Sequence, residues 1–202
     1  MKILGINGSS NADGNTFYML DKILKICEKE GAETEIISAA KAVCDAKTPF
    51  CVCCSSPCSK ACYKNTLLDE AFAKIDEADA VIFGSPVYFG SMTAQLKAFF
   101  DKTRDVRARK AWVGIPAAAV SVGGSKYGGQ ESTINAIQDC LFISGMSVFG
   151  SGYFDTDGGQ MGIGAHRPAC DDEFANGRCE SMAKRALFEA RRHEMYKQAE
   201  KR

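Results

Sequence analysis

The sequence lacks an excess of charge of either sign, because its 25 lysines and arginines balance its 25 aspartates and glutamates. A balanced surface exerts no long-range attraction on nucleic acid or on an anionic membrane. The sequence also lacks an apolar run of about 18 residues, the length that a membrane-spanning helix needs, and it shows no secretory signal at its start. We therefore expect a cytoplasmic protein that binds neither nucleic acid nor a membrane.

Histidine is scarce, with two copies in 202 residues, and the sequence offers no convincing acid–base pair. His166 is followed by Arg167, and the usual exposure of such residues predicts a solvated loop here rather than a substrate contact. His193 lies in a charged stretch and is assigned no role. We assign no catalytic residue, and we expect the chemistry to come from bound cofactors that the protein tunes.

Cysteine, by contrast, is abundant, and five of the ten copies fall within residues 51–62. Without an export signal a disulfide framework is not expected, and five cysteines among Ser, Pro and Lys cannot all face a core. The preferred interpretation is an iron–sulfur cluster held by four thiolates, followed by a tetrahedral zinc site and then a disulfide knot. The scattered cysteines, which we expect to be buried or idle thiols, are Cys27, Cys44, Cys140, Cys170 and Cys179.

The spacing within residues 51–62 favours a cluster. Its candidate ligands run C-x2-C-x3-C-x3-C, so one short loop can wrap one cube of iron and sulfide, and they are Cys51, Cys54, Cys58 and Cys62. Structural zinc sites more often use two separated ligand pairs, and no second pair is near. Cys53 is surplus. Adjacent residues point in different directions, so we expect only one of Cys53 and Cys54 to bind, and we prefer Cys54.

The remainder of the chain alternates apolar runs with helical patterns, which predicts an α/β domain. We expect strands at 2–7, 33–38, 78–84, 115–122 and 146–150. Residues 2–7 and 78–84 are apolar runs of the kind that is typical of buried parallel strands. We expect helices at 17–29, 67–77, 91–102 and 132–143. Residues 155–166 are glycine-rich and predict a surface loop or lid, and residues 171–201 predict an exposed amphipathic helix.

Three of these strands end in unusual loops at the carboxyl edge of the predicted sheet, where ligands of open α/β sheets bind. Residues 8–16 offer backbone N–H groups to one terminal phosphate, although an ordinary Ser or Asn helix cap fits them equally well. Tyr88 and Phe89 flank bare backbone in the second loop, and the glycines of the third let backbone approach a flat ring. The three loops together predict a pocket for flavin mononucleotide (FMN).

The residues that we expect to bind FMN come from all three loops. They are Ser9, Ser10, Asn11, Asn15 and Thr16 in the first, Pro86, Val87, Tyr88, Phe89 and Gly90 in the second, and Gly123 and Gly124 in the third.

Four segments also resemble a known family. They are GSSNADGNT at 8–16, ADAVIFGSPVY at 78–88, LKAFFDK at 96–102, and the two glycine pairs with Gln and Glu at 123–131. In this order and spacing they are similar to segments of the iron–sulfur flavoproteins, a branch of the flavodoxin-like NAD(P)H-dependent FMN reductases. The resemblance covers roughly residues 1–150, the usual extent of a doubly wound domain. The compact cysteine insert sets this branch apart.

Two features depart from the family pattern. Asn11 stands where the family loop often has an arginine, and the loss of that charge weakens the expected binding of phosphate. The family cysteine pattern is usually C-x2-C-x2-C followed by four to seven residues and C. In this chain the second gap is three residues and Cys53 is extra.

The resemblance implies one flavodoxin-like domain over residues 1–202, with a doubly wound five-stranded parallel sheet in the order 2-1-3-4-5. It implies FMN at the strand ends, a [4Fe-4S] cluster in an insert at about 44–65 after strand two, and a C-terminal loop and helix at about 153–202. It also implies a homodimer or homotetramer, with the cluster of one subunit near the flavin of another.

We therefore expect an FMN- and [4Fe-4S]-dependent oxidoreductase. Electrons would come from a redox partner such as a ferredoxin or from NAD(P)H, and they would pass to a small-molecule acceptor. Two alternatives stay open. One is an NAD(P)H-dependent FMN or quinone reductase whose cysteines hold a structural zinc. The other is a non-catalytic module that senses redox state.

Overall fold

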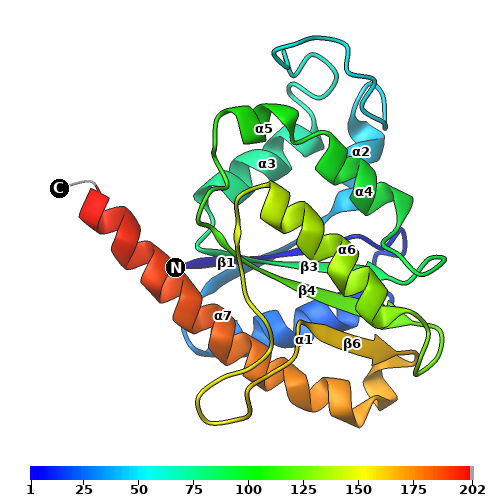
Figure 1. Cartoon of the computed structure of the whole chain (residues 1–202), viewed down its shortest axis with the longest axis vertical. Helices are drawn as coiled ribbons and strands as arrows, with labels where there is room; N and C mark the ends of the chain where they lie inside the picture. Colours follow the sequence, from blue (N-terminus) through cyan, green and yellow to red (C-terminus); the bar gives the residue numbers. More distant parts are fainter. Residues whose placement is uncertain (201–202) are drawn as a thin grey trace.

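A parallel β-sheet divides the molecule into two helical layers (Figure 1). The computed structural model describes residues 1–200. The strands are β1 (Lys2–Asn7), β2 (Glu33–Ser38), β3 (Ala80–Pro86), β4 (Pro116–Gly123), β5 (Ser147–Val148) and β6 (Ile163–His166). They pair in the order β2-β1-β3-β4-β5, with every pair parallel, and this confirms the predicted flavodoxin-like topology.

The fifth position of the sheet is split between two short strands. β5 pairs with the first two residues of β4, and β6 pairs with its last four, from Val120 to Gly123. The chain leaves the sheet between them and returns through a narrow neck, where Ser151 N–H donates to Gln160 O at 2.9 Å. The predicted surface loop at 155–166 is therefore wrong for its last four residues, because Ile163 and Ala165 are buried in the sheet.

Helices cover both faces of the sheet (Figure 1). One layer holds α2 (Ala39–Asp45), α3 (Leu67–Glu77), α4 (Ala94–Asp101), α5 (Arg104–Ala108) and α6 (Gln130–Ile143), and the other holds α1 (Asn15–Lys29) and α7 (Glu173–Glu200). Neighbouring strand residues point to opposite faces, so Leu4 and Ile6 lie in the core of the first layer and Ile3 in that of the second. The four predicted helices are present, and α2 and α5 are additional.

The C-terminal helix α7 is more deeply packed than predicted. Its buried stripe is Ala175, Cys179, Met182, Ala183, Ala186, Leu187 and Ala190, all in the core shared with α1. Small residues such as alanine let the two helices approach closely. Because alanines give only a weak apolar pattern in the sequence, this buried face was not recognised, and the prediction of an exposed helix is wrong for it. The predicted end at Lys201 lies outside the described residues. None of the helices in residues 1–200 is both long enough and apolar enough to span a bilayer.

Candidate functional site

Four strands end at one edge of the sheet, and the segments that follow them gather there. Asn7 of β1 lies opposite Gly84 of β3, and Gly123 of β4 lies opposite His166 of β6. The loops predicted to surround FMN occupy this edge, at residues 8–16, 85–91 and 123–131. The structure thus brings the predicted FMN-binding residues to the carboxyl edge of the sheet, the usual ligand site of such folds.

The first loop is held by hydrogen bonds between its own backbone and side chains, and no side chain caps the start of α1. Ser9 N–H donates to Asn7 Oδ1 at 3.0 Å, and Asn11 N–H donates to Ser9 Oγ at 3.1 Å. Gly14 is the N-cap residue of α1, and no side chain caps the helix there. The alternative of an ordinary Ser or Asn cap is therefore wrong, and the N–H groups of the first turn are left for an anion.

Two glycines allow the loops to approach one another. A Cβ on Gly8 would lie 2.8 Å from Gly84 O, so no other residue fits where the first loop crosses β3. Gly129 has φ 94°, and a Cβ there would lie 3.2 Å from both Gly90 Cα and Val87 Cγ1. The second and third loops are therefore in direct contact, and together they form one surface.

Tyr88 and Phe89 lie in a tight turn at the tip of the second loop. Tyr88 N–H donates to Ser91 O at 2.9 Å, and Ser91 N–H donates to Tyr88 O at 3.1 Å. The two central residues, Phe89 (φ 50°) and Gly90 (φ 76°), are left-handed, as the central residues of a type I′ turn are. Tyr88 is half-exposed and Phe89 fully exposed, so both rings are available to a flat ligand.

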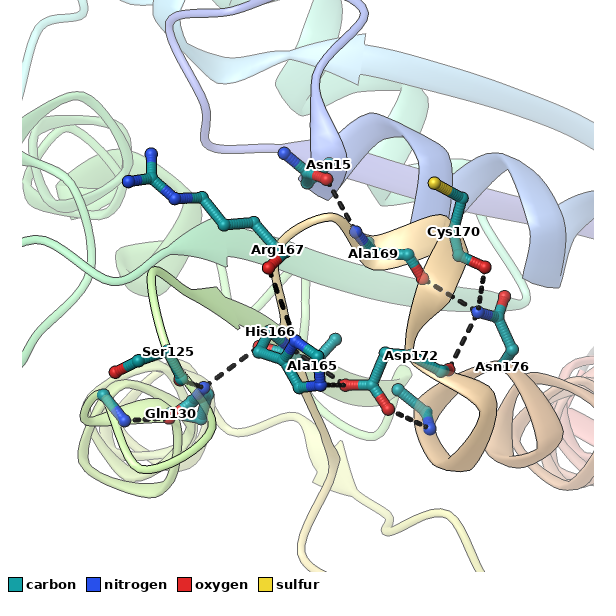
Figure 2. Close-up of polar contacts among 12 residues, drawn as sticks. Asn15, Ser125, Gln130, Ala165, His166, Arg167, Ala169, Cys170, Asp172 and Asn176 are labelled. Atoms are coloured by element: carbon teal, nitrogen blue, oxygen red, sulfur yellow. Dashed lines mark hydrogen bonds and ion pairs between the residues drawn. The ribbon is translucent and has the colours of Figure 1, made fainter.

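Gln130 holds the third loop in place; it belongs to one of the family-like segments but was not among the predicted site residues. Its buried Nε2 donates to Ser125 O at 2.6 Å and to Ala165 O at 3.1 Å, and its Oε1 accepts from Gly128 N–H at 2.8 Å. The loop is thereby tied both to itself and to β6 (Figure 2). A buried glutamine at a helix start would have been the signal, but burial is not visible in the sequence.

The segment after β6 adds a wall to the site that was not predicted. Ala169 N–H donates to Asn15 Oδ1 at 2.7 Å, which joins this segment to the start of α1 (Figure 2). Asp172 accepts from His166 N–H at 2.9 Å and from Ala175 N–H at 3.0 Å, so it links β6 to the first turn of α7. His166 is therefore held at the strand end, and the predicted solvated loop is wrong for this residue.

Arg167 extends from the same segment towards the three loops (Figure 2). Its side chain is exposed, and its Nε lies 3.9 Å from the position of a Cβ built on Gly124. Within residues 1–200 the guanidinium forms no ion pair. The sequence separation between Arg167 and the loops hid this proximity. The residue places a positive charge at the sheet edge that also carries Asn11, the position at which the sequence departs from the family pattern described above.

The cysteine loop, residues 46–66, lies elsewhere. It projects beyond α2 at the top of Figure 1, whereas the strands point to the right of that view. Its five cysteines are free and either exposed or half-buried. Cys53, Cys51 and Cys58 lie beside Arg104 and raise the pKa of its guanidinium. Cys62 packs against the core, where Lys102 Nζ donates to its Sγ at 3.3 Å.

A chain of ion pairs fastens this loop to the helices below it. Lys60 Nζ lies 3.2 Å from Asp105 Oδ2, and Arg109 contacts both Asp105, at 2.7 Å, and Asp76, at 3.1 Å. Trp112 Nε1 donates to Asp76 Oδ1 at 3.0 Å. Burial favours a raised pKa for Asp105, but Arg109 and Lys60 outweigh it and hold the pKa of this carboxyl below its ordinary value.

The buried cysteines differ from those of the loop. Burial raises the pKa of the Cys27 and Cys179 thiols to about 12, so both remain protonated at neutral pH. This agrees with the prediction of buried thiols for these two residues, whereas Cys44 and Cys170 are exposed.

Comparison with known proteins places the chain in a family. A model of the NADPH-dependent FMN reductases matches residues 1–160. An iron-sulfur flavoprotein of Methanocaldococcus jannaschii is 37% identical over 175 residues, which cover 86% of this chain and 88% of that relative. An iron-sulfur flavoprotein of Methanosarcina thermophila is 36% identical over 151 residues, covering 74% and 78%.

A solved structure agrees with the fold. The WrbA-like flavodoxin from Agrobacterium tumefaciens superposes with a TM-score of 0.67 at 18% identity, covering 95% of this chain and 98% of its own. The chain therefore belongs to the NADPH-dependent FMN reductase family of oxidoreductases, and within that family to the iron-sulfur flavoproteins.

Proposed function

We propose that this chain is an FMN- and [4Fe-4S]-dependent oxidoreductase that passes electrons between a cluster, a flavin and a small acceptor. The observation that carries the proposal is the cysteine loop, in which five free thiols are held at the surface of a flavin-family domain. Thiolates are the ligands of iron–sulfur clusters. The family supports a nicotinamide as the electron donor. A ferredoxin-like protein is the alternative donor, and it would pass single electrons to the cluster.

FMN fits the carboxyl edge of the sheet. The uncapped start of α1 and the loop at residues 8–16 would hold the phosphate, and Arg167 would supply a positive charge nearby. The ring would lie against the surface formed by residues 86–90, Gly123 and Gly124. When bound, FMN exchanges hydride with a nicotinamide and single electrons with a cluster. The side chains here orient and enclose the flavin, and none of them is proposed as an acid or a base.

The donor set of the cysteine loop fits a [4Fe-4S] cluster. Each iron of the cube takes one thiolate, so four cysteines spread along one loop meet the requirement. Tyr63 gives independent support. Its hydroxyl is buried and has no hydrogen-bond partner within residues 1–200, and a cluster sulfur would be an acceptor for it.

The proposed ligands are Cys51, Cys54, Cys58 and Cys62, chosen by their spacing. Cys53 is the alternative to Cys54, because it shares the neighbourhood of Arg104 with Cys51 and Cys58. A homodimer or homotetramer would complete the relay. The cysteine loop and the flavin loops lie on different sides of one chain (Figure 1), so a second copy would bring its flavin edge to the cluster.

The test is to measure iron, zinc, acid-labile sulfide and FMN per chain in protein purified without oxygen. About four irons and four sulfides beside one FMN are expected, the stoichiometry of a cube held by four thiolates. Zinc without sulfide would contradict the cluster and make the loop a structural clasp in an FMN or quinone reductase. A full complement of cofactors without turnover by any donor would favour a redox sensor.

A further inference from the structure

Lys102 is a buried lysine whose amine lies at one of the proposed cluster ligands. The residue follows α4 as its C-cap, and its side chain is 1% exposed. Its Nζ donates a hydrogen bond to Cys62 Sγ at 3.3 Å. Lysines are almost never fully buried unless they are paired. The pairing of this buried amine with the sulfur of Cys62 therefore needs an explanation.

A helix C-terminus alone does not explain this position. Lysines near a C-terminus interact favourably with the helix dipole, and such side chains usually keep their charged amine in water. Lys102 instead turns inward, next to a thiol that packs against the core. A neutral thiol is a weak acceptor, whereas a thiolate bound to iron is a strong one. The contact is therefore suited to Cys62 as a cluster ligand.

Tyr63 lies in the same buried region and points to the same conclusion. It follows Cys62 in the chain, is 1% exposed, and has no hydrogen-bond partner for its hydroxyl within residues 1–200. One buried donor thus contacts Cys62 itself and another belongs to the next residue in the chain, while Cys53 and Cys54 of the same loop are exposed.

We propose that Lys102 is a positioning residue that holds Cys62 through an N–H···S hydrogen bond and raises the reduction potential of the cluster. This inference rests on the proposed function. Reduction adds one electron to the cluster and makes it more negative, so a positive donor at a ligand sulfur stabilises the reduced form more than the oxidised one. Lys102 touches no substrate and takes no part in proton transfer.

The test is the midpoint potential of the cluster's one-electron couple, followed by electron paramagnetic resonance during an anaerobic redox titration. Lys102→Met keeps an unbranched side chain of similar length but removes the donor and its charge. We expect it to retain iron, sulfide and FMN. The reduction equilibrium should shift about tenfold towards the oxidised form, the effect of one charge-assisted hydrogen bond. For a one-electron couple this corresponds to about 59 mV in the negative direction.

Lys97→Met is the matched control, because Lys97 lies on the same helix but its Nζ bonds Asp101 at the surface. Its potential should equal that of the wild type. A fully loaded Lys102→Met protein with an unchanged potential would overturn the inference and leave the proposed function intact. Wild-type protein without iron and sulfide would overturn both.

A second variant covers the case in which Lys102→Met folds and binds FMN but holds no cluster. Lys102→Gln keeps an N–H donor, one bond closer to the backbone, and loses the charge. A loaded Lys102→Gln protein with a lowered potential would support the inference, and one with the wild-type potential would overturn it. Failure of both variants to load a cluster into folded protein would also overturn it, since tuning one ligand would not abolish assembly.

Discussion

Phe89 adopts a backbone conformation that phenylalanine seldom takes. Its φ of 50° places it in the left-handed region, yet its side chain is 110% exposed and gains nothing from packing within the chain. Such a conformation costs a residue with a Cβ roughly 1–2 kcal/mol. Strain of this kind at the edge of a site indicates a role for the ring outside the fold itself, and stacking on the flavin is the role that the site suggests.

Phe89→Asn should therefore stabilise the fold and weaken flavin retention. Asparagine tolerates the left-handed region, so we expect the free energy of unfolding of the cofactor-free protein to rise by about 1 kcal/mol. Urea unfolding measures the first effect and FMN titration the second. Phe142→Asn is the control, because Phe142 is also exposed but lies in α6, where asparagine brings no gain. A Phe89→Asn protein that is less stable and binds FMN normally would refute this account of the strain.

At the scale of single elements, the prediction succeeded where one periodic signal was strong. The bounds of β1 and α3 agree with the predicted ones, because a short apolar run and helical spacing are local properties of the sequence. β6 was missed because it has only four residues, too few for a clear pattern in the sequence. Its place in the sheet, beyond the end of β5, is set by its pairing with β4. The inward face of α7 was missed because a stripe of alanines becomes a core only against α1.

The site shows the same division between local and distant information. Loops that follow strands could be placed at one edge from topology alone, and the structure gathers them there. The contributions of Gln130 and Arg167 depend on contacts with chain segments far away in the sequence. Lys102 at Cys62 is the clearest case, since the two residues are brought together only when α4 packs beneath the cysteine loop.

The helix α7 also carries a histidine whose charge state couples to folding. His193 is partly buried, and its Nε2 has no hydrogen-bond partner in residues 1–200. Burial and the nearby Lys197 lower its pKa below the ordinary value of 6.5, against an opposing effect of Asp79. The unfolded chain therefore takes up a proton at higher pH than the folded one, and stability falls as the pH drops below about 6.5.

His193→Gln should flatten this pH dependence. Between about pH 7.5 and 5.5 the free energy of unfolding of the wild type should decrease more steeply than that of the variant. The difference in slope should stay below about 1.4 kcal/mol per pH unit, the limit for one whole proton. Urea unfolding at several pH values measures both slopes. Parallel slopes would show that His193 titrates alike in the folded and unfolded states.

At the scale of the whole molecule, the two candidate sites are separate. The flavin loops lie at the carboxyl edge of the sheet, and the cysteine loop is fastened to α5 and α3 through Lys60, Asp105 and Arg109. Changes at distant sites without shared partners usually act independently, within about 0.5 kcal/mol. Loss of the cluster should therefore leave FMN affinity in the isolated chain almost unchanged.

Cys54→Ala tests this separation together with the ligand assignment. We expect it to lose iron and sulfide but to bind FMN within about 0.5 kcal/mol of the wild type. Cys53→Ala is the matched control, one residue away in the same loop, and it should keep both cofactors. The reverse pattern would assign Cys53 as the ligand. Loss of FMN together with iron from Cys54→Ala would show that the two sites are coupled.

The split fifth position of the sheet also makes the protein a natural scaffold for grafting. Ala117 pairs with Val148 and Val120 with Ile163, so two strand positions remain between β5 and β6. Phe149 and Gly162 can fill them in an unbroken register. Excision of residues 150–161 and a direct join would then leave one continuous edge strand. The segment between Ser151 and Gln160 could equally be replaced by one of different length, and no strand of the sheet would have to move.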